Sequence, residues 1–302
     1  MKAVRFDEYG GPEVLYVADV EPPAAGPGEI RIAVRAAGVN GVDCKIRSGY
    51  LKEFMPVSFP SATGVDAAGV VDQVGAGVEG VAVGDRVFGN GRGTWAEQAI
   101  LTSWAKMPDW LGFDQAAGYP LPAETALRIL RLARVKPGET LLVNGASGGV
   151  GSAVMQIARH RGVAVIGIAS EPHHEYLRRF GAVPATYGDG LVDRVRRVSQ
   201  GTIDAALDIA GSGVLPELIE LTGDASRVVT IVDFGAEALG AKASWAAEDF
   251  PADLAEVADL IRQRKFATPV ARSFQLADAA MAQEACALGH VAGRMVVTVQ
   301  GL

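Results

Sequence analysis

Residues 141–151 read Leu-Leu-Val-Asn-Gly-Ala-Ser-Gly-Gly-Val-Gly, and this stretch decides the fold. A short apolar run enters a glycine-rich turn, and the segment that leaves the turn places Val150, Val154, Ile157 and Ala158 on one face at helical spacing. A buried strand, a tight glycine turn and an amphipathic helix, in this order, are the context in which a glycine motif indicates a dinucleotide phosphate site. The stretch therefore predicts the first strand–turn–helix unit of a nucleotide-binding domain.

The turn has the composition that a pyrophosphate group needs. Gly148 and Gly149 lack a Cβ atom, so an anion can approach the backbone closely. The free N–H groups and the positive dipole end of the following helix favour that anion. Ala146 stands where the strict fingerprint has its first glycine, and a glycine-rich loop on its own could be a plain turn. The residues expected to contact the cofactor are Ala146, Ser147, Gly148, Gly149, Val150 and Gly151.

Length and composition limit the possible functions of the chain. Its 302 residues favour two domains, and 49% hydrophobic residues suffice for two cores. The net charge of −7 argues against nucleic acid or an anionic membrane as the main partner. Only two cysteines, far apart in the sequence, indicate no disulfide framework and a reducing compartment. Because we find no leader-type apolar block and no run long enough to span a membrane, we expect a soluble cytoplasmic protein.

The first third of the chain has the pattern of a β-rich domain. Short alternating or β-branched runs are separated by turn clusters rich in glycine and proline. Such a pattern, with few helical segments, predicts a small β-barrel-like domain. The pattern changes near Phe113, after which residues 116–133 are expected to form a helix. The expected strands are residues 2–6, 30–37, 69–74, 86–89 and 95–101.

Strands and helices alternate in the middle of the chain. This rhythm predicts an α/β fold with a doubly wound parallel sheet that holds its ligand at the carboxyl ends of the strands. The nucleotide domain, residues 114–265, is expected to be inserted into a discontinuous β-rich domain of residues 1–113 and 266–302. After the central strand, further strands are expected at 163–169, 186–187, 203–209 and 227–232, and helices at 172–180, 191–199, 215–221 and 252–264. The tail is expected to be extended at 268–274, helical at 276–288 and a strand at 294–299.

Several short motifs occur together in an order that carries a family resemblance. They are Gly-Val-Asn-Gly-Val-Asp-Cys-Lys-Ile-Arg-Ser-Gly-Tyr at 38–50, Val-Gly-Asp-Arg-Val at 83–87, the glycine loop, and Gly-His-Val-Ala-Gly-Arg-Met-Val-Val at 289–297. On these motifs the chain resembles, over essentially its whole length, the zinc-free quinone oxidoreductase branch of the medium-chain dehydrogenase/reductase superfamily. The resemblance implies a Rossmann sheet inserted in a GroES-like domain, and a homodimer formed through an edge strand such as 227–232.

The residues that bind zinc in the alcohol dehydrogenase branch of that superfamily are replaced here. That branch has a cysteine after the first Gly-Val and a Gly-His-Glu further along, whereas this chain has Asn40 and Gly64-Val65-Asp66. Cys44 has no histidine placed to join it and is expected to be an inert thiol. We therefore expect no metal. Without a zinc ion to assist an alcohol, hydride transfer to an electron-poor quinone or α,β-unsaturated carbonyl is easier.

The residues after the second strand of the nucleotide domain bear on the choice between NADPH and NADH. An acidic residue about twenty positions past the fingerprint would hold the ribose hydroxyls of NAD. Ser170 is neutral, and Glu171 near the expected position lies at an ordinary proline-containing helix start. The resemblance implies a lysine and a tyrosine at the 2′-phosphate of NADP; Tyr187 matches the tyrosine, and His173 stands in place of the lysine. We favour NADPH, held by these two residues and Ser170, with a solvated helix face as the alternative for His173 and its neighbour His174.

The resemblance also implies residues near the reacting groups. Asn40 and Thr125 match positions near the nicotinamide, and Arg294 matches a C-terminal basic residue that reaches the cofactor region. Lys45 and Tyr50 are candidates for stabilising or protonating the reduced product. Core packing is the alternative role for Thr125, and simple solvation is the alternative for Lys45.

Two further expectations concern strand ends and an ion pair. Ala210 and Phe234-Gly235 follow strand ends that the cofactor must pass, with core packing as the alternative for Phe234. Asp43 and Arg47 are expected to form a structural ion pair within the first domain.

Together these expectations describe an NADPH-dependent, zinc-independent reductase that transfers a hydride to a quinone. A 2-alkenal or enoyl reductase is the alternative on the same fold, and it differs because one carbon of the product must be protonated. A non-catalytic NADPH-binding protein is the alternative of another class. The acidic net charge makes an RNA-binding version of it less favourable.

Overall fold

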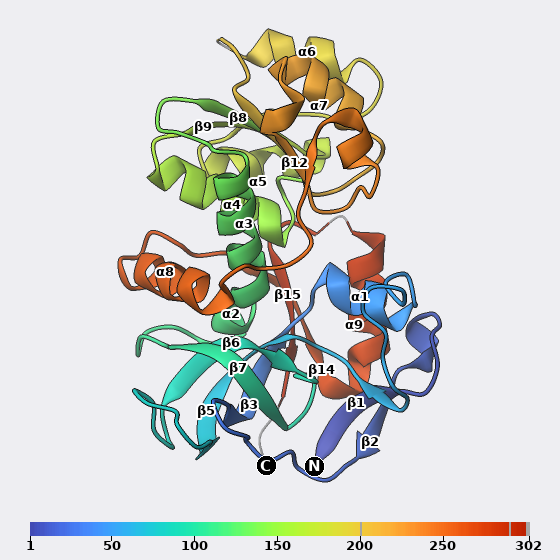
Figure 1. Cartoon of the computed structure of the whole chain (residues 1–302), viewed down its shortest axis with the longest axis vertical. Coiled ribbons are helices and arrows are strands. Elements are labelled where there is room, and N and C mark those ends of the chain that lie inside the picture. Colours follow the sequence, from blue (N-terminus) through green and yellow to red (C-terminus); the bar gives the residue numbers. More distant parts are fainter. Residues whose placement is uncertain (200, 290, 300–302) are drawn as a thin grey trace. The chain divides into compact units, whose positions relative to one another are not determined.

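The computed structural model describes residues 1–199, 201–289 and 291–299, and its contacts divide the chain into two compact units (Figure 1). The first unit comprises Met1–Leu121, Phe250–Arg262 and Ala267–Leu302. The second unit comprises Pro122–Asp249 and Gln263–Phe266. The first unit is therefore discontinuous in sequence, and the chain passes from it to the second unit within helix α3 (Pro120–Leu132).

The second unit is built on a six-stranded parallel sheet. The chain enters at β8 in the middle, winds outward to β10 on one side, and then crosses to β11 and winds outward to β13. This order confirms the predicted doubly wound Rossmann topology, and it places the turn after β8 beside the point where the strand order reverses. In spatial order the strands are β10 (Val183–Ala185), β9 (Ala164–Ile168), β8 (Thr140–Asn144), β11 (Ala205–Asp208), β12 (Val228–Thr230) and β13 (Lys242–Ala243).

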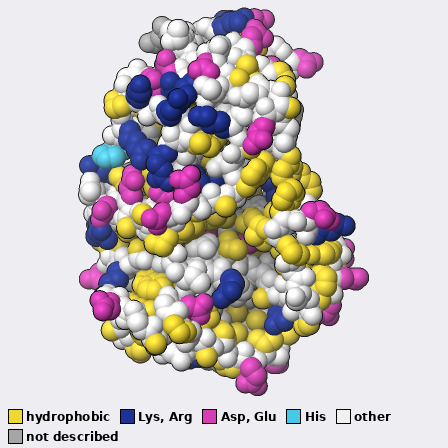
Figure 2. All heavy atoms as spheres, in the orientation of Figure 1, with side chains coloured by type: hydrophobic (Ala, Val, Ile, Leu, Met, Phe, Trp, Pro, Cys, Tyr) yellow, Lys and Arg dark blue, Asp and Glu magenta, His cyan; other side chains and the backbone are white. Residues whose placement is uncertain are grey.

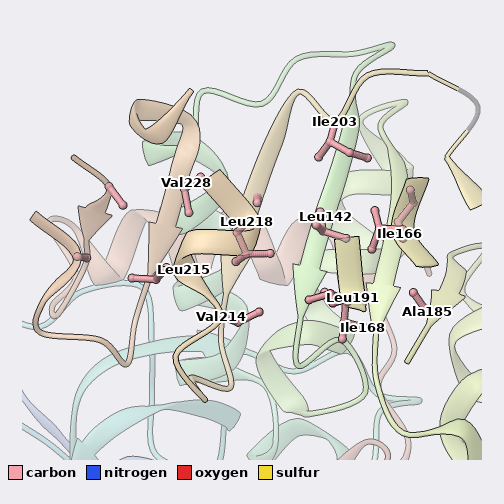
Figure 3. Packing of buried hydrophobic residues seen from close by; sticks show 14 residues of the cluster. Leu142, Ile166, Ile168, Ala185, Leu191, Ile203, Val214, Leu215, Leu218 and Val228 are labelled. Atoms are coloured by element: carbon pink, nitrogen blue, oxygen red, sulfur yellow. The ribbon is translucent and has the colours of Figure 1, made fainter. Parts of the chain in front are cut away.

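Buried aliphatic side chains hold helices against this sheet. Leu142 from β8 and Ile166 from β9 belong to a cluster that also contains Leu191, Leu215 and Leu218 from two helices (Figure 3). Continuous apolar runs in the strands are expected where a parallel sheet is covered on both faces. The helices of this unit after α3 are α4 (Gly149–His160), α5 (His174–Arg179), α6 (Leu191–Val198) and α7 (Leu215–Thr222).

The first unit contains the barrel-like sheet that the sequence predicts. Strand β3 (Ile30–Gly38) pairs with both β5 and β7, so β3, β5, β6 and β7 close on themselves. A strand from the end of the chain, β15, pairs with the last residues of β3, which makes the unit discontinuous in sequence. The other strands of this sheet are β5 (Asp66–Val74), β6 (Arg86–Arg92), β7 (Gln98–Lys106), β14 (Val270–Gln275) and β15 (Arg294–Thr298), and a separate sheet contains β2 (Tyr16–Asp19), β1 (Lys2–Phe6) and β4 (Ser61–Ala62).

Among the residues that the structure describes, α-helices complete the first unit, and apolar clusters form its core. One cluster surrounds Trp95 and Phe274, and another fills the barrel around Ile32 and Leu101. The helices are α1 (Gly41–Arg47), α2 (Phe113–Ala117), α8 (Phe250–Arg262) and α9 (Ala279–Leu288).

Several predicted boundaries differ from the structure for identifiable reasons. The helix expected at 116–133 is two helices, α2 and α3, because the chain turns at Gly118. The strand expected at 95–101 is displaced to 98–106, since Trp95 lies before β7 in the core. Residues 186–187 are not a strand: β10 ends at Ala185, and a loop follows.

Two expectations about the edges of the nucleotide domain are also corrected. Strand 227–232 is shorter than expected and is not an edge, because β13 pairs with β12 on its outer side. The helix expected at 252–264 forms as α8, but contacts assign it to the first unit rather than to the nucleotide domain. Chain order did not reveal that α8 packs against β7 of the barrel.

The surface mixes charges of both signs. Figure 2 shows Lys and Arg interspersed with Asp and Glu on this face, with the densest cluster of Lys and Arg over the second unit. None of the helices in the described ranges is both long and apolar enough to cross a membrane.

Candidate functional site

The glycine loop lies between β8 and α4, as the strand–turn–helix pattern predicts. Gly145 has a φ of +84°, a left-handed conformation that favours glycine. A Cβ atom on Gly151 would lie 2.3 Å from the carbonyl oxygen of Gly145, so this glycine lets α4 pack directly on the loop. Ala146, the departure from the strict fingerprint, is buried, and a Cβ on Gly167 of β9 would lie 2.9 Å from its methyl carbon. The missing side chain at Gly167 therefore makes room for the extra methyl group.

The amino end of α4 is open to an anion. Gly148 is the N-cap residue, and no described side chain caps the helix there. A Cβ on Gly148 would meet only the carbonyl oxygen of Gly145, at 3.6 Å, so nothing in the fold itself demands glycine at this position. The free N–H groups and the dipole of a helix of twelve residues favour a negatively charged group at this place.

Polar side chains at three adjacent strand ends form a buried network. Asn144, Asp208 and Thr230 are the last residues of β8, β11 and β12, and they are register neighbours in the sheet. Asn144 Nδ2 donates to Asp208 Oδ1 at 2.9 Å and to the carbonyl oxygen of Gly211 at 3.1 Å. Thr230 Oγ1 donates to Asp208 Oδ2 at 2.9 Å. The network fixes the loops after β11 and β12, which contain the predicted residues Ala210, Phe234 and Gly235.

Three of the predicted phosphate-binding side chains lie together beside the glycine loop. His173 Nδ1 is 3.2 Å from Ser147 Oγ and 3.4 Å from Ser170 Oγ. Ser170 follows β9, and Ser147 belongs to the loop itself, so His173 bridges two strand ends. The neighbouring His174 Nε2 instead contacts the carbonyl oxygen of Ala169 at 3.3 Å. The two histidines therefore have different environments, and only His173 faces the loop.

The predicted Tyr187 lies on the loop that follows the next strand, β10. Its side chain is 52% exposed. Arg194 of α6 holds this loop, because its guanidinium donates to the carbonyl oxygens of residues 186, 187, 188 and 189. The sequence analysis did not identify Arg194, although a cationic residue shortly after the Gly-Asp-Gly turn at 188–190 could have indicated a side chain that binds the loop carbonyl groups.

Thr125 lies in a buried polar cluster. Its hydroxyl donates to Glu124 Oε2 at 3.2 Å, and Arg128 Nε donates to Glu124 Oε1 at 2.6 Å. Arg128 also donates to Ser244 from the segment after β13. Thr125 is thus buried, as its core-packing alternative expects, and its hydroxyl is bonded within a polar cluster.

Phe234 forms an aromatic pair with a residue that the sequence did not single out. The rings of Phe234 and Trp245 are stacked, with centroids 4.5 Å apart and planes inclined by 20°. The two residues follow the carboxyl ends of the paired strands β12 and β13, and their side chains are 47% and 50% exposed. The pair thus presents aromatic surface at the edge of the sheet where ligands bind in this topology.

In the first unit, Asn40 and Arg294 come together over a buried carboxyl group. Asn40 Oδ1 accepts from Arg294 Nη2 at 2.7 Å, and Asn40 Nδ2 donates to Asp66 Oδ2 at 3.0 Å. Asn90 and the backbone N–H of Leu121 also donate to Asp66. Burial raises the pKa of the Asp66 carboxyl to about 6, although the nearby Arg294 and these hydrogen bonds lower it. Asp66, at the position where the alcohol dehydrogenase branch has a zinc ligand, thus serves here as a buried acceptor for three hydrogen-bond donors.

The expected ion pair between Asp43 and Arg47 does not form. Asp43 is the third residue of α1, and its Oδ2 accepts from the backbone N–H of the N-cap residue Asn40 at 2.9 Å, which makes the capping box that starts the helix. Arg47 Nε donates to Gln283 Oε1 at 2.6 Å, and its Nη1 donates to the carbonyl oxygen of Gly10. Burial raises the pKa of Asp43 well above its usual value. Asp43 does not pair with Arg47 because the capping box turns its carboxylate back toward the start of α1.

Lys45 and Tyr50, the candidate donors on the substrate side, lie near one another. The Lys45 ammonium is 6.0 Å from the centre of the Tyr50 ring. Lys45 is partly buried, and desolvation lowers its pKa, whereas Tyr50 is exposed. Large apolar side chains of the following loop, Phe54, Met55 and Phe59, are also exposed. Within the described ranges, no three His, Cys, Asp or Glu side chains gather as a metal site.

Comparisons with known proteins agree with this architecture. Residues 26–114 match the alcohol dehydrogenase GroES-like domain, and residues 183–297 match the zinc-binding dehydrogenase family. The human quinone oxidoreductase is 34% identical over 241 residues, covering 76% of this chain and 73% of that protein. The Pseudomonas aeruginosa quinone oxidoreductase is 32% identical over 330 residues, covering 98% of this chain and 99% of that protein. The structure of Escherichia coli quinone oxidoreductase complexed with NADPH superposes with a TM-score of 0.87 at 28% identity, covering 99% of this chain and 100% of that one.

Proposed function

Because the chain belongs to the quinone oxidoreductase branch of the medium-chain dehydrogenase/reductase superfamily, we propose that it is an NADPH-dependent reductase that transfers a hydride to a quinone. The observation that carries the cofactor assignment is the uncapped amino end of α4 behind the glycine loop. Bound NADPH supplies the hydride, and the protein supplies binding, orientation and hydrogen-bond donors.

The residues present fit the pyrophosphate and the 2′-phosphate of NADPH. We place the pyrophosphate beside Gly148 at the start of α4, where no described side chain caps the helix and an added Cβ atom would meet only the Gly145 carbonyl oxygen. His173, Ser147 and Ser170 offer hydrogen-bond donors to the 2′-phosphate, and Tyr187 adds a phenol from the adjacent loop. Glu171, the acidic residue that would favour NADH, is exposed in a short 3-10 helix. The donors therefore favour NADPH.

The stacked pair of Phe234 and Trp245 supports a planar acceptor. Exposed aromatic faces bind planar π-systems by stacking, which contributes about 0.5–1.5 kcal/mol beyond area burial. A quinone offers a whole ring face for this stacking, whereas an aliphatic 2-alkenal offers only its four-atom enal group. The pair thus favours the quinone over the alternative on the same fold.

Reduction of a quinone leaves charge on its oxygen atoms, and donors must stabilise that charge. Lys45 and Tyr50 carry an ammonium and a phenol that can donate to such an oxygen. Desolvation lowers the pKa of Lys45, which makes its proton easier to transfer. Asn40 and Arg294 hold each other in place and keep the start of α1 fixed.

The test is NADPH oxidation by the purified protein with 9,10-phenanthrenequinone and with 2-hexenal, and with NADH as the control cofactor. We expect quinone turnover that prefers NADPH. Trp245→Ala is expected to raise the KM for the quinone about tenfold, and Trp245→Phe to keep it near the native value. Turnover of the alkenal alone would assign the protein to the double-bond reductases, and NADPH binding without turnover of either would indicate a non-catalytic binder.

A further inference from the structure

The two cysteines of the chain, which lie far apart in the sequence, meet in the first unit. Cys44 is on α1 and Cys286 is in the last turn of α9, and these helices pack together. Cys44 Sγ lies 3.5 Å from the carbonyl oxygen of Gln283, one helical turn before Cys286, and each thiol shifts the pKa of the other. Spacing along the chain could not predict this pairing, because it depends on how the end of the chain returns to the first unit.

The interface of α1 and α9 holds the two thiols in place through a matched set of side chains. Cys44 and Arg47 are three residues apart on α1, and Gln283 and Cys286 are three residues apart on α9, so each pair lies on one helix face. Arg47 Nε donates to Gln283 Oε1 at 2.6 Å. Cys44 Sγ donates to the carbonyl oxygen of Gln283 at 3.5 Å, and this carbonyl points toward the turn of α9 that carries Cys286. Gln283 is anchored in turn by donating to Thr63 Oγ1 at 3.1 Å.

The two thiols are not equivalent. The interaction with the neighbouring Cys44 thiol lowers the pKa of Cys286, and the positive charge of Arg294 lowers it further. The interaction with Cys286, together with burial, raises the pKa of Cys44, whose S–H donates to the carbonyl oxygen of Gln283. Cys286 is therefore the better nucleophile, and Cys44 is a protonated partner beside it. Both side chains are partly exposed, so a small oxidant can reach them.

We propose that Cys44 and Cys286 are a site of reversible modification, a dithiol that a hydroperoxide converts to an intrachain disulfide. The Cys286 thiolate attacks one oxygen of hydrogen peroxide, the O–O bond breaks, and a sulfenic acid forms while the leaving hydroxide takes up a proton to become water. The Cys44 sulfur then attacks the sulfenic sulfur, and the thiol proton of Cys44 leaves with the departing hydroxyl as a second water. Both cysteines are oxidised by one electron each, and the peroxide is reduced by two. A dithiol reductant reverses the reaction by thiol–disulfide exchange.

The modification would act on a functional part of the first unit. The disulfide covalently joins α1, which begins beside Asn40, to α9, which precedes β15 and Arg294. Because the link closes a loop of most of the chain, it restricts the unfolded state and raises the Tm by several degrees. It also fixes the start of α1 relative to Arg294.

The experiment uses the full chain, reduced and then treated with one equivalent of hydrogen peroxide. Remaining thiols are alkylated with iodoacetamide, and the intact mass is measured. We expect a protein lighter by two hydrogen atoms that takes up no alkyl group, a tryptic cross-link between the peptides of Cys44 and Cys286, and recovery of two alkylatable thiols after dithiothreitol. Since the chain has no other cysteine, an intrachain disulfide can only be this one.

Single variants test the order of events. In Cys44→Ser the sulfenic acid at Cys286 has no partner and is trapped by dimedone, and in Cys286→Ser the remaining Cys44 reacts at least about tenfold more slowly. Two alkylatable thiols in oxidised wild-type protein of native circular dichroism would overturn the proposal. Disulfide-linked dimers in place of the intrachain product would overturn it as well, and faster trapping in Cys286→Ser than in Cys44→Ser would overturn the assignment of the nucleophile.

Discussion

The glycines of the phosphate loop serve two different purposes, and a pair of alanine variants separates them. In Gly151→Ala, the new Cβ would lie 2.3 Å from the Gly145 carbonyl oxygen and 2.6 Å from both Cα and the carbonyl oxygen of Ala146. All three are backbone atoms, so α4 must move away from the loop to relieve the contact. In Gly148→Ala, the new Cβ would meet only the Gly145 carbonyl oxygen, at an ordinary 3.6 Å.

The expected magnitudes follow from these contacts. Overpacking costs about 1–3 kcal/mol, and three contacts with backbone place Gly151→Ala near the upper limit. A loss of about 3 kcal/mol lowers the Tm by roughly 5 °C in a chain of this length, because the unfolding entropy is about 2 cal/mol/K per residue. Gly148→Ala changes only an N-cap residue in open space and is expected to cost about 1 kcal/mol or less. Its methyl group nevertheless occupies the approach of the pyrophosphate, so we expect the Kd for NADPH to rise at least about tenfold, or 1.4 kcal/mol.

Thermal melting without cofactor and fluorescence titration with NADPH measure the two effects separately. Gly151→Ala is expected to lose both stability and NADPH affinity, and Gly148→Ala to lose affinity alone. An unchanged Kd in Gly148→Ala would refute the placement of the pyrophosphate at the start of α4. An unchanged Tm in Gly151→Ala would refute the packing argument.

The remaining predictions concern single side chains. Burial raises the pKa of Asp66 from 3.8 in the unfolded chain to about 6 in the folded protein. The unfolded chain therefore releases this proton at lower pH than the folded protein does. The stability that the protonated carboxyl contributes is present below the unfolded-state pKa and is lost as the pH rises through the folded-state pKa. Urea unfolding at pH values of about 4 and 7 is expected to show a loss of about 2 kcal/mol from this group in the wild type that is absent in Asp66→Asn. Arg194→Ala removes the hydrogen bonds that hold the loop of residues 186–189, and we expect it to raise the KM for NADPH about tenfold with little effect on the KM for NADH. Arg196→Ala on the same helix serves as the control. Equal increases of KM for both cofactors would contradict the role of the loop. His173→Lys adds a full positive charge beside the two serines and is expected to lower the Kd for NADPH, but not for NADH, about tenfold in fluorescence titration.

The parts of the fold that sequence predicted are those in which local pattern and tertiary structure agree. The stretch 141–151 forms β8, the loop and the start of α4 as expected, because apolar run, glycine and helical spacing each favour the same local conformation. The alternation of strands and helices after it determines the parallel sheet, since parallel strands need crossover connections. Short segments such as β13, with two residues, carry too little pattern to be recognised.

The parts that sequence missed depend on partners distant in the chain. Asn144 and Asp208 meet only because β8 and β11 are register neighbours, and the register is a property of the assembled sheet. Arg47 was assigned to Asp43 on sequence proximity, but it binds Gln283 on another helix. A long cationic side chain can reach many carboxyl or amide groups, so its partner is decided by packing and not by spacing along the chain.

Ala146 shows why a motif is best interpreted as a set of separate physical requirements. The first position of the fingerprint is expected to be glycine, yet the buried methyl group of Ala146 is accepted because Gly167, on the adjacent strand β9, has no side chain to oppose it. Gly151 has no such compensation, since the atoms that face it belong to the backbone of the same loop. Gly148 faces no protein atom closer than ordinary contact, so only a ligand can explain a requirement for glycine at that position. Ala146 thus depends on the neighbouring strand, Gly151 on the packing of α4, and Gly148 on the bound cofactor. The departure at Ala146 therefore says nothing against cofactor binding at Gly148.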